Sequence, residues 1–74
     1  MDFSEALTQL RAGERLQRAG WNGKGLWIAI QRPDAHSKMG HPYLYISDVN
    51  GILAPWTASQ TDILATDWQP VRKA

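Results

Sequence analysis

The stretch "YLYISDVNGILAPW", residues 43–56, decides how this chain folds. In its first half, leucine and isoleucine alternate with tyrosine, which places the apolar residues on one face of a strand and the tyrosines on the other. Asn50-Gly51 follows, and this pair between two such runs is the strongest short signal for a β-hairpin, with a type I′ turn. We therefore expect paired strands at residues 43–49 and 52–56.

Three further segments extend the sheet. Residues 26–31 form the clearest strand, and apolar residues stand on both of its faces. They are Leu26, Ile28 and Ile30 on one face, and Trp27 and Ala29 on the other. This pattern indicates that both faces are covered, one by a helix and the other by a second subunit. Shorter extended pieces are expected at residues 15–19 and 68–72. Pro70 places its strand at a sheet edge, and Pro55 forces either an edge position or a bulge near the end of its strand.

Residues 2–12 have the period of an amphipathic helix. Their apolar stripe, at i, i+3, i+4 and i+7, consists of Phe3, Ala6, Leu7 and Leu10. Asp2 is placed to cap the free N–H groups, and Glu5 would complete a capping box. Gly13 supplies the left-handed residue that ends the helix. We expect this helix to lie on the sheet.

A second, short helix follows the hairpin, capped by Thr57 or Ser59 and ending at residue 64 or 65. The predicted fold class is α+β: a small antiparallel sheet with an N-terminal helix on one face and a short helix after a β-hairpin. The 74 residues are expected to form a single domain, residues 1–74. A domain this small is marginally stable alone, and the chain has no cysteine for a disulfide, so we expect a homo-oligomer.

The charge is nearly balanced, with eight Lys and Arg residues against seven Asp and Glu. This argues against a nucleic-acid polymer as partner, since such proteins have a clustered basic excess. A mild basic cluster, Arg11, Arg15, Arg18 and Lys24, is either a solvated face or a rim for a few phosphates. No apolar run approaches the ~20 residues of a membrane span, and the N-terminus lacks a signal-peptide pattern. A cytoplasmic protein is expected.

No group of residues meets the requirements of catalysis. Ser59, Thr61 and Asp62 lie close together, but capping of a helix start explains each of them. His36 and His41 fall in a polar loop and are too few for a metal site. We therefore expect a protein that is not an enzyme and that has neither cofactor nor metal.

A binding module fits the sequence better. Trp21, Trp56 and Trp68 each lie beside a turn or a helix end with polar neighbours. Such rings can stack on purine bases, at about 1–3 kcal/mol per stack, or they can be core or interface residues. The turn Asn22-Gly23-Lys24 offers backbone N–H groups and an ammonium to an anion, or is an ordinary hairpin loop.

The run "SQTD", residues 59–62, presents donors and acceptors at the start of the short helix, where phosphate is favoured. These residues are Ser59, Gln60, Thr61 and Asp62. Asp62 can accept from ribose hydroxyls or an amino group, or it only complements the helix dipole. From the residues alone we expect a homo-oligomeric module for a flat, polar ligand that can carry phosphate.

Three blocks carry a resemblance: "MDFSEALTQLRAGERLQRAGWNGKGLWI", the central "YLYISDVNGILAPW" and the closing "ASQTDILATDW". Two motifs within them are specific. They are Trp21-Asn22-Gly23-Lys24, and Pro55-Trp56 followed by Ala58-Ser59-Gln60-Thr61-Asp62 and Asp67-Trp68. Over nearly the whole chain, these blocks resemble a small phage and bacterial family, that of the second Thoeris anti-defence protein.

The resemblance implies a sponge. Members of the family sequester cyclic ADP-ribose isomers, the signals of Thoeris immune systems, without cleaving them, and some also hold cyclic oligonucleotides at a separate site. They are homotetramers with ligand pockets between subunits. The ligand contacts implied for this chain are Trp21, Asn22, Gly23, Lys24, Pro55, Trp56, Ser59, Gln60, Thr61 and Asp62. The loop over residues 32–41 is longer than the family pattern or differs from it in composition, so the resemblance does not specify which nucleotide is bound.

Two other classes stay open at this point. The first is a single-stranded nucleic-acid binder that uses the same aromatic residues, against which the near-neutral charge speaks. The second is a structural or protein-interaction subunit, likewise a small homo-oligomer, whose tryptophans all lie in interfaces. For the sponge itself, a homodimer is the alternative to a homotetramer.

Overall fold

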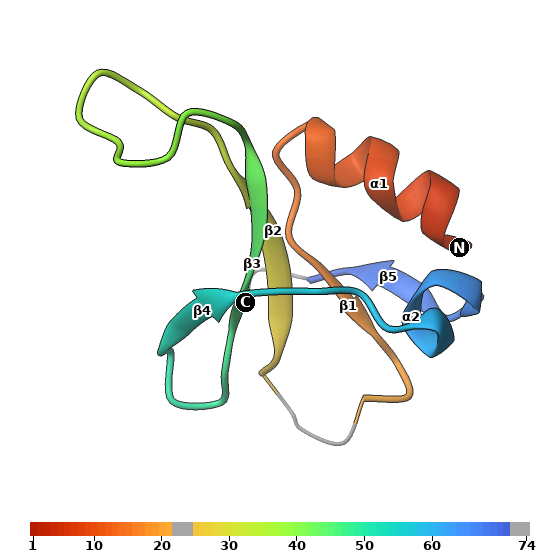
Figure 1. Ribbon diagram of the computed structural model, residues 1–74. Helices are drawn as coiled ribbons and strands as arrows, with labels where there is room; N and C mark the ends of the chain where they lie inside the picture. The colour runs from red at the N-terminus through yellow and green to blue at the C-terminus, as the bar shows by residue number, and fades with distance from the viewer. Residues whose placement is uncertain (22–24, 72–74) are drawn as a thin grey trace.

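The architecture is the α+β class expected from the sequence (Figure 1). The computed structural model describes residues 1–21 and 25–71. The elements are α1 (Phe3–Arg11), β1 (Leu16–Arg18), β2 (Trp27–Gln31), β3 (Tyr43–Ser47), β4 (Leu53–Pro55), α2 (Gln60–Leu64) and β5 (Trp68–Pro70). Within the described ranges, neither helix is long and apolar enough to cross a bilayer.

The strands form one antiparallel sheet in the order β4-β3-β2-β1-β5. Its longest pairing joins β2 to β3, from Trp27 opposite Ser47 to Gln31 opposite Tyr43. Proline stands in both edge strands, Pro55 in β4 and Pro70 in β5. The edge positions predicted from these prolines are confirmed. Proline has no backbone N–H to donate, so a strand that contains it is not readily paired on both sides.

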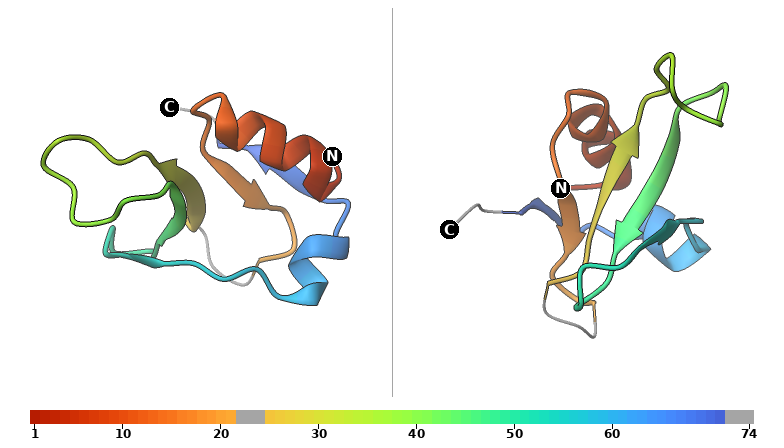
Figure 2. Two further views of the ribbon diagram at one scale, coloured as in Figure 1. Left: turned by 45° about the horizontal axis from the view of Figure 1, so that its top comes forward. Right: turned by 90° about the vertical axis from the view of Figure 1, so that its left-hand side faces the viewer.

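The helix α1 covers one face of the sheet and forms the core there. Figure 2 shows it lying along β1 and β5. Ala6 and Leu10 of the helix pack against Leu16, Ile28 and Trp68 of three strands, and all five side chains are at most 2% exposed. Because Leu16 and Ile28 are cross-strand partners, they lie side by side on the face that α1 buries.

Asp2 and Gly13 lie at the two ends of α1, as predicted. The Asp2 carboxylate accepts the Glu5 backbone N–H at 2.9 Å, and Gly13 has a φ of +96°. The predicted capping box is only half formed, since in this described segment the Asp2 backbone N–H donates no reciprocal hydrogen bond to the Glu5 carboxylate. One helix end therefore rests on a single side-chain cap.

The hairpin forms at the predicted place, but the prediction of a type I′ turn is wrong. That turn needs positive φ at both Asn50 and Gly51, and of these two only Gly51, at +78°, has it. The Gly51 N–H donates to the Asp48 carbonyl at 3.0 Å. The Asp48 carboxylate accepts from the N–H groups of Asn50 and Ile52 at 2.8 and 2.9 Å. Asp48 thus starts a type I turn that a left-handed glycine closes.

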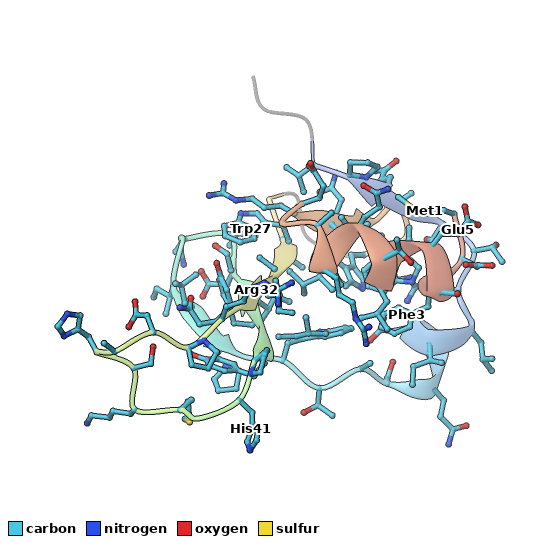
Figure 3. All side chains as sticks on the ribbon, turned by 90° about the horizontal axis from the view of Figure 1, so that it is seen from above. Met1, Phe3, Glu5, Trp27, Arg32 and His41 are labelled. Atoms are coloured by element: carbon cyan, nitrogen blue, oxygen red, sulfur yellow. The ribbon has the colours of Figure 1, made fainter. Side chains whose placement is uncertain are left out.

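The second face of the sheet points away from α1. The Trp27 and Tyr45 rings meet there edge to face, with centroids 5.9 Å apart, and the Arg15 guanidinium lies 4.2 Å from the Trp27 ring centroid. The connection over residues 32–42 is a loop, as predicted, and His41 projects from it (Figure 3). An aromatic surface is therefore left on the side that the helix does not cover.

Candidate functional site

Four aromatic rings meet under the start of α1: Phe3, Trp21, Trp56 and Trp68. Trp68 is central and 2% exposed, with ring centroids of Phe3, Trp21 and Trp56 at 5.4, 5.3 and 6.1 Å. Trp68 is therefore a core residue, which decides between its two interpretations. Trp21 and Trp56 meet each other at 6.4 Å and 65°, and both are only half-buried.

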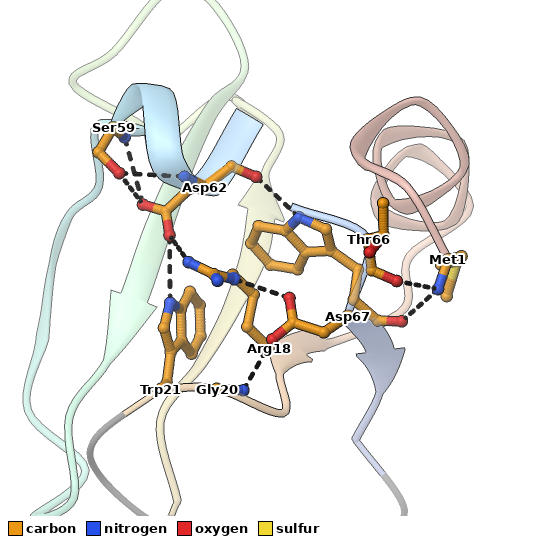
Figure 4. Close-up of polar contacts among 9 residues, drawn as sticks. Met1, Arg18, Gly20, Trp21, Ser59, Asp62, Thr66 and Asp67 are labelled. Carbon is orange, nitrogen blue, oxygen red and sulfur yellow. Dashed lines mark hydrogen bonds and ion pairs between the residues drawn. The ribbon is translucent and has the colours of Figure 1, made fainter. Parts of the chain in front are cut away.

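Asp62 ties this aromatic cluster to α2 (Figure 4). Its Oδ1 accepts from Arg18 Nη1 at 2.8 Å and from Trp21 Nε1 at 3.2 Å. Its Oδ2 accepts from the backbone N–H and the hydroxyl of Ser59, at 3.2 and 2.9 Å. Ser59 Oγ accepts the Asp62 N–H at 3.1 Å, which completes a capping box. A carboxylate has about four acceptor sites, so contacts within the chain occupy those of Asp62.

Arg18, at the end of β1, lies at the centre of the polar contacts in Figure 4. Its Nη1 pairs with Asp62, and its Nε pairs with Asp67 Oδ1 at 2.8 Å. Asp67 Oδ2 accepts the Gly20 N–H, also at 2.8 Å. The side chains of Arg18 and Asp62 are 16% and 13% exposed, so water screens their pair only weakly. One guanidinium thus joins β1 to α2 and to the segment before β5.

These contacts hold both acids ionised. Burial opposes ionisation of Asp62, but hydrogen bonds from Arg18, Ser59 and Trp21 outweigh it and keep the pKa of its carboxyl below the usual value. The hydrogen bond from Arg18, with the Gly20 N–H, lowers the pKa of Asp67. Neither acid is poised near neutral pH for proton transfer. Nowhere in residues 1–21 and 25–71 do three His, Cys, Asp or Glu side chains gather as a metal site requires.

The structure brings together part of the predicted ligand site. Trp21 and Asp62 are hydrogen-bonded, Trp56 packs beside Trp21, and Ser59 caps the helix that carries Asp62. The first two residues of α2, Gln60 and Thr61, are exposed.

The remaining predicted residues lie elsewhere or outside the description. Pro55 stands opposite Tyr45 in the ladder and so faces the other side of the sheet from Trp56, which packs against the core. There it lines a hollow of about 130 Å³ with Tyr45 and Leu53. Asn22, Gly23 and Lys24 lie outside the described residues.

Sequence patterns placed Arg18 in a basic cluster and Asp67 in a family motif, but they did not show that the two side chains form an ion pair. The interpretation of the basic cluster as a solvated face or a phosphate rim is wrong for Arg18, because its guanidinium is engaged by Asp62 and Asp67. Arg15 lies instead against Trp27 on the opposite face. Two acids close together near a short helix, Asp62 and Asp67, indicate that one basic side chain could pair with both. They do not identify it, since Arg18 is 44 and 49 residues away along the chain.

Comparisons with known proteins relate this chain to one family. Residues 1–71 match the Thoeris anti-defense 2-like domain family, Tad2-like, a range that includes every element described above. The chain is also similar to the protein named Thoeris anti-defense 2 of Bacillus phage SP01. The two are 33% identical over an alignment of 84 residues, and the match covers 96% of this chain and 94% of the phage protein.

Proposed function

This chain belongs to the Thoeris anti-defense 2-like family, and from this premise we propose that it counters Thoeris defence by sequestering the immune signal. The proposed ligand is a cyclic ADP-ribose isomer, with cyclic oligonucleotides as a second class for such a sponge. The mechanism is binding without turnover in the cytoplasm of the host cell. The ionised, internally paired state of Asp62 and Asp67 supports binding rather than acid–base catalysis.

The observation that carries this proposal is the fixed pair Trp21 and Trp56. Their rings stand 6.4 Å apart at 65°, and buried Trp68 packs edge-on against both. The Trp21 indole N–H is anchored on Asp62. Rings held in this way lose little further freedom when a ligand binds, which favours stacking on a flat base. Both rings keep an exposed part for that contact.

We assign the polar parts of the ligand to groups around these rings. Residues 60–61 are exposed at the start of α2, and residues 22–24 directly follow Trp21 in the sequence. Asp62 and Ser59 have a different task, since their hydrogen bonds to each other, and those of Asp62 to Arg18 and Trp21, occupy them. They hold Trp21 and α2 in place rather than contact ribose.

The second face of the sheet is the proposed contact between copies in a homotetramer or homodimer. It carries four large side chains: Trp27, Tyr43, Tyr45 and Leu53. Tyr43 and Leu53 are 38% and 58% exposed, an arrangement typical of a surface that a partner covers. Pairing of sheet edges is disfavoured because Pro55 and Pro70 interrupt the N–H donors of the two edge strands.

Calorimetric titration of a cyclic ADP-ribose isomer tests the ligand site. Trp21→Ala and Trp56→Ala each remove one stack, about 1–3 kcal/mol, and should weaken binding by about 5- to 150-fold. Leu64→Ala is the control, because this side chain of α2 is 78% exposed, and its affinity should equal that of the wild type.

Thermal melting of the same variants separates a ligand platform from a core residue. If both tryptophan variants melt far lower while the remaining folded protein binds at full strength, the rings are core and the proposal fails. Tight binding of single-stranded nucleic acid with a steep salt dependence would point to a nucleic-acid binder instead.

A further inference from the structure

We propose that Arg18 is a positioning residue, which holds the Trp21 ring in the orientation that stacks on the ligand. This inference rests on the proposed function and names a residue outside the two sequence motifs. Arg18 is connected to the Trp21 ring through Asp62. It is connected to the backbone that precedes Trp21 through Asp67.

The first route fixes the ring itself. Arg18 Nη1 and Trp21 Nε1 donate to the same oxygen of Asp62, at 2.8 and 3.2 Å. The shorter, charge-assisted bond sets where that oxygen lies, and the indole follows it. Packing against Trp68 at 5.3 Å and 81° leaves the ring edge-on, so a moved oxygen would tilt its exposed part.

The second route fixes the backbone that enters Trp21. Arg18 Nε holds Asp67, whose other oxygen accepts the Gly20 N–H at 2.8 Å. A Cβ on Gly20 would come within 2.9 Å of this oxygen, so only glycine leaves room for the contact. The Trp21 N–H then donates to the Arg18 carbonyl at 3.2 Å and closes the turn.

Only arginine can serve both routes at once. Its planar fork presents Nε to Asp67 and Nη1 to Asp62, whereas lysine offers one point charge on a flexible stem. Arg18→Lys therefore keeps the net charge but gives up one of the two contacts. If the contact to Asp62 is lost, the indole of Trp21 is no longer held in place, and if the contact to Asp67 is lost, the Gly20 backbone is no longer held in place.

The experiment compares Arg18→Lys with Arg15→Lys. Arg15 is a matched control: it is also an arginine beside a tryptophan, but it lies 4.2 Å from the Trp27 ring on the other face. Nitrogen-15 NMR of the indole N–H groups gives one resonance per tryptophan, assigned with Trp21→Phe and Trp27→Phe. We expect Arg18→Lys to shift or broaden the Trp21 resonance, and Arg15→Lys to move only that of Trp27.

Titration of the same proteins with a cyclic ADP-ribose isomer gives the functional readout. Arg18→Lys should bind at least about 5-fold more weakly, the lower limit for loss of one stack, and Arg15→Lys should bind as the wild type does. If Arg18→Lys does not fold, Asp67→Asn is measured in its place with the same expectation. Wild-type affinity together with an unmoved Trp21 resonance overturns the inference.

Failure of the proposed function looks different. In that case the wild type does not bind the ligand at all, and the Trp21 resonance still decides whether Arg18 holds the ring. A moved resonance with unchanged affinity would also overturn the positioning role, since the orientation of the ring would then not matter for binding.

Discussion

Asp62→Asn keeps the shape of the side chain but removes its charge and one of its two acceptor oxygens. In the wild type, one oxygen serves Arg18 and Trp21, and the other serves Ser59. An asparagine amide can satisfy only one of these sides, and its NH₂ group meets donors on the other. A hydrogen bond to a charged group contributes about 1.5–3 kcal/mol, and at 13% exposure little water can replace it. Arg18 retains Asp67 as partner, so we expect a loss of about 2–3 kcal/mol in the free energy of unfolding.

For a domain of this size that loss corresponds to a fall in melting temperature of about 8–24 °C. Calorimetric melting at one fixed protein concentration is the assay, because the stability of an oligomer depends on concentration. Glu14→Gln is the matched control: it makes the same acid-to-amide change at an exposed position and should melt within about 2 °C of the wild type. An Asp62→Asn protein as stable as this control would refute the assignment of Asp62 to holding the fold.

Three further results are expected. The pKa values of Asp62 and Asp67 are lowered in the folded protein, so the stability that these acids contribute is complete above the ordinary carboxyl pKa of about 4 and is lost as pH falls through the folded values. Urea unfolding at a series of pH values should show this decline in the free energy of unfolding, and the decline should be smaller in Asp62→Asn. Gly51→Ala forces a side chain to a φ of +78° and should cost about 1–2 kcal/mol by urea unfolding, whereas Gly40→Ala, with open space around it, should cost less than half as much. Light scattering at micromolar concentration should give a mass above 8.3 kDa, and Tyr45→Glu on the second sheet face should lower it; a monomeric wild type contradicts the proposed assembly.

Features set by neighbouring residues could be predicted from the sequence. The stripe of α1, the alternation in β3 and the edge prolines each depend on local geometry, and each lies where expected. The turn type was missed because two local preferences compete. Asn50-Gly51 favours a type I′ turn, but the Asp48 carboxylate bonds two later N–H groups and favours type I.

The candidate site was predictable only in part. Sequence position marked Trp21, Trp56 and Asp62, but it could not say which tryptophan is buried, since this depends on how β5 pairs with β1. Nor could it find Arg18, whose partners come from distant segments that only the folded sheet brings together. It also grouped Pro55 with Trp56, although neighbours in an extended chain face opposite sides of the sheet.

The central claim is sequestration without cleavage, and one measurement tests it directly. The protein is mixed with a cyclic ADP-ribose isomer, separated from free ligand by gel filtration and heated, and the released compound is analysed by mass spectrometry. Recovery of the intact isomer in a fixed molar ratio to protein, independent of incubation time, is the predicted result. Elution without bound isomer, or linear cleavage products that accumulate in proportion to protein and time, would contradict the account.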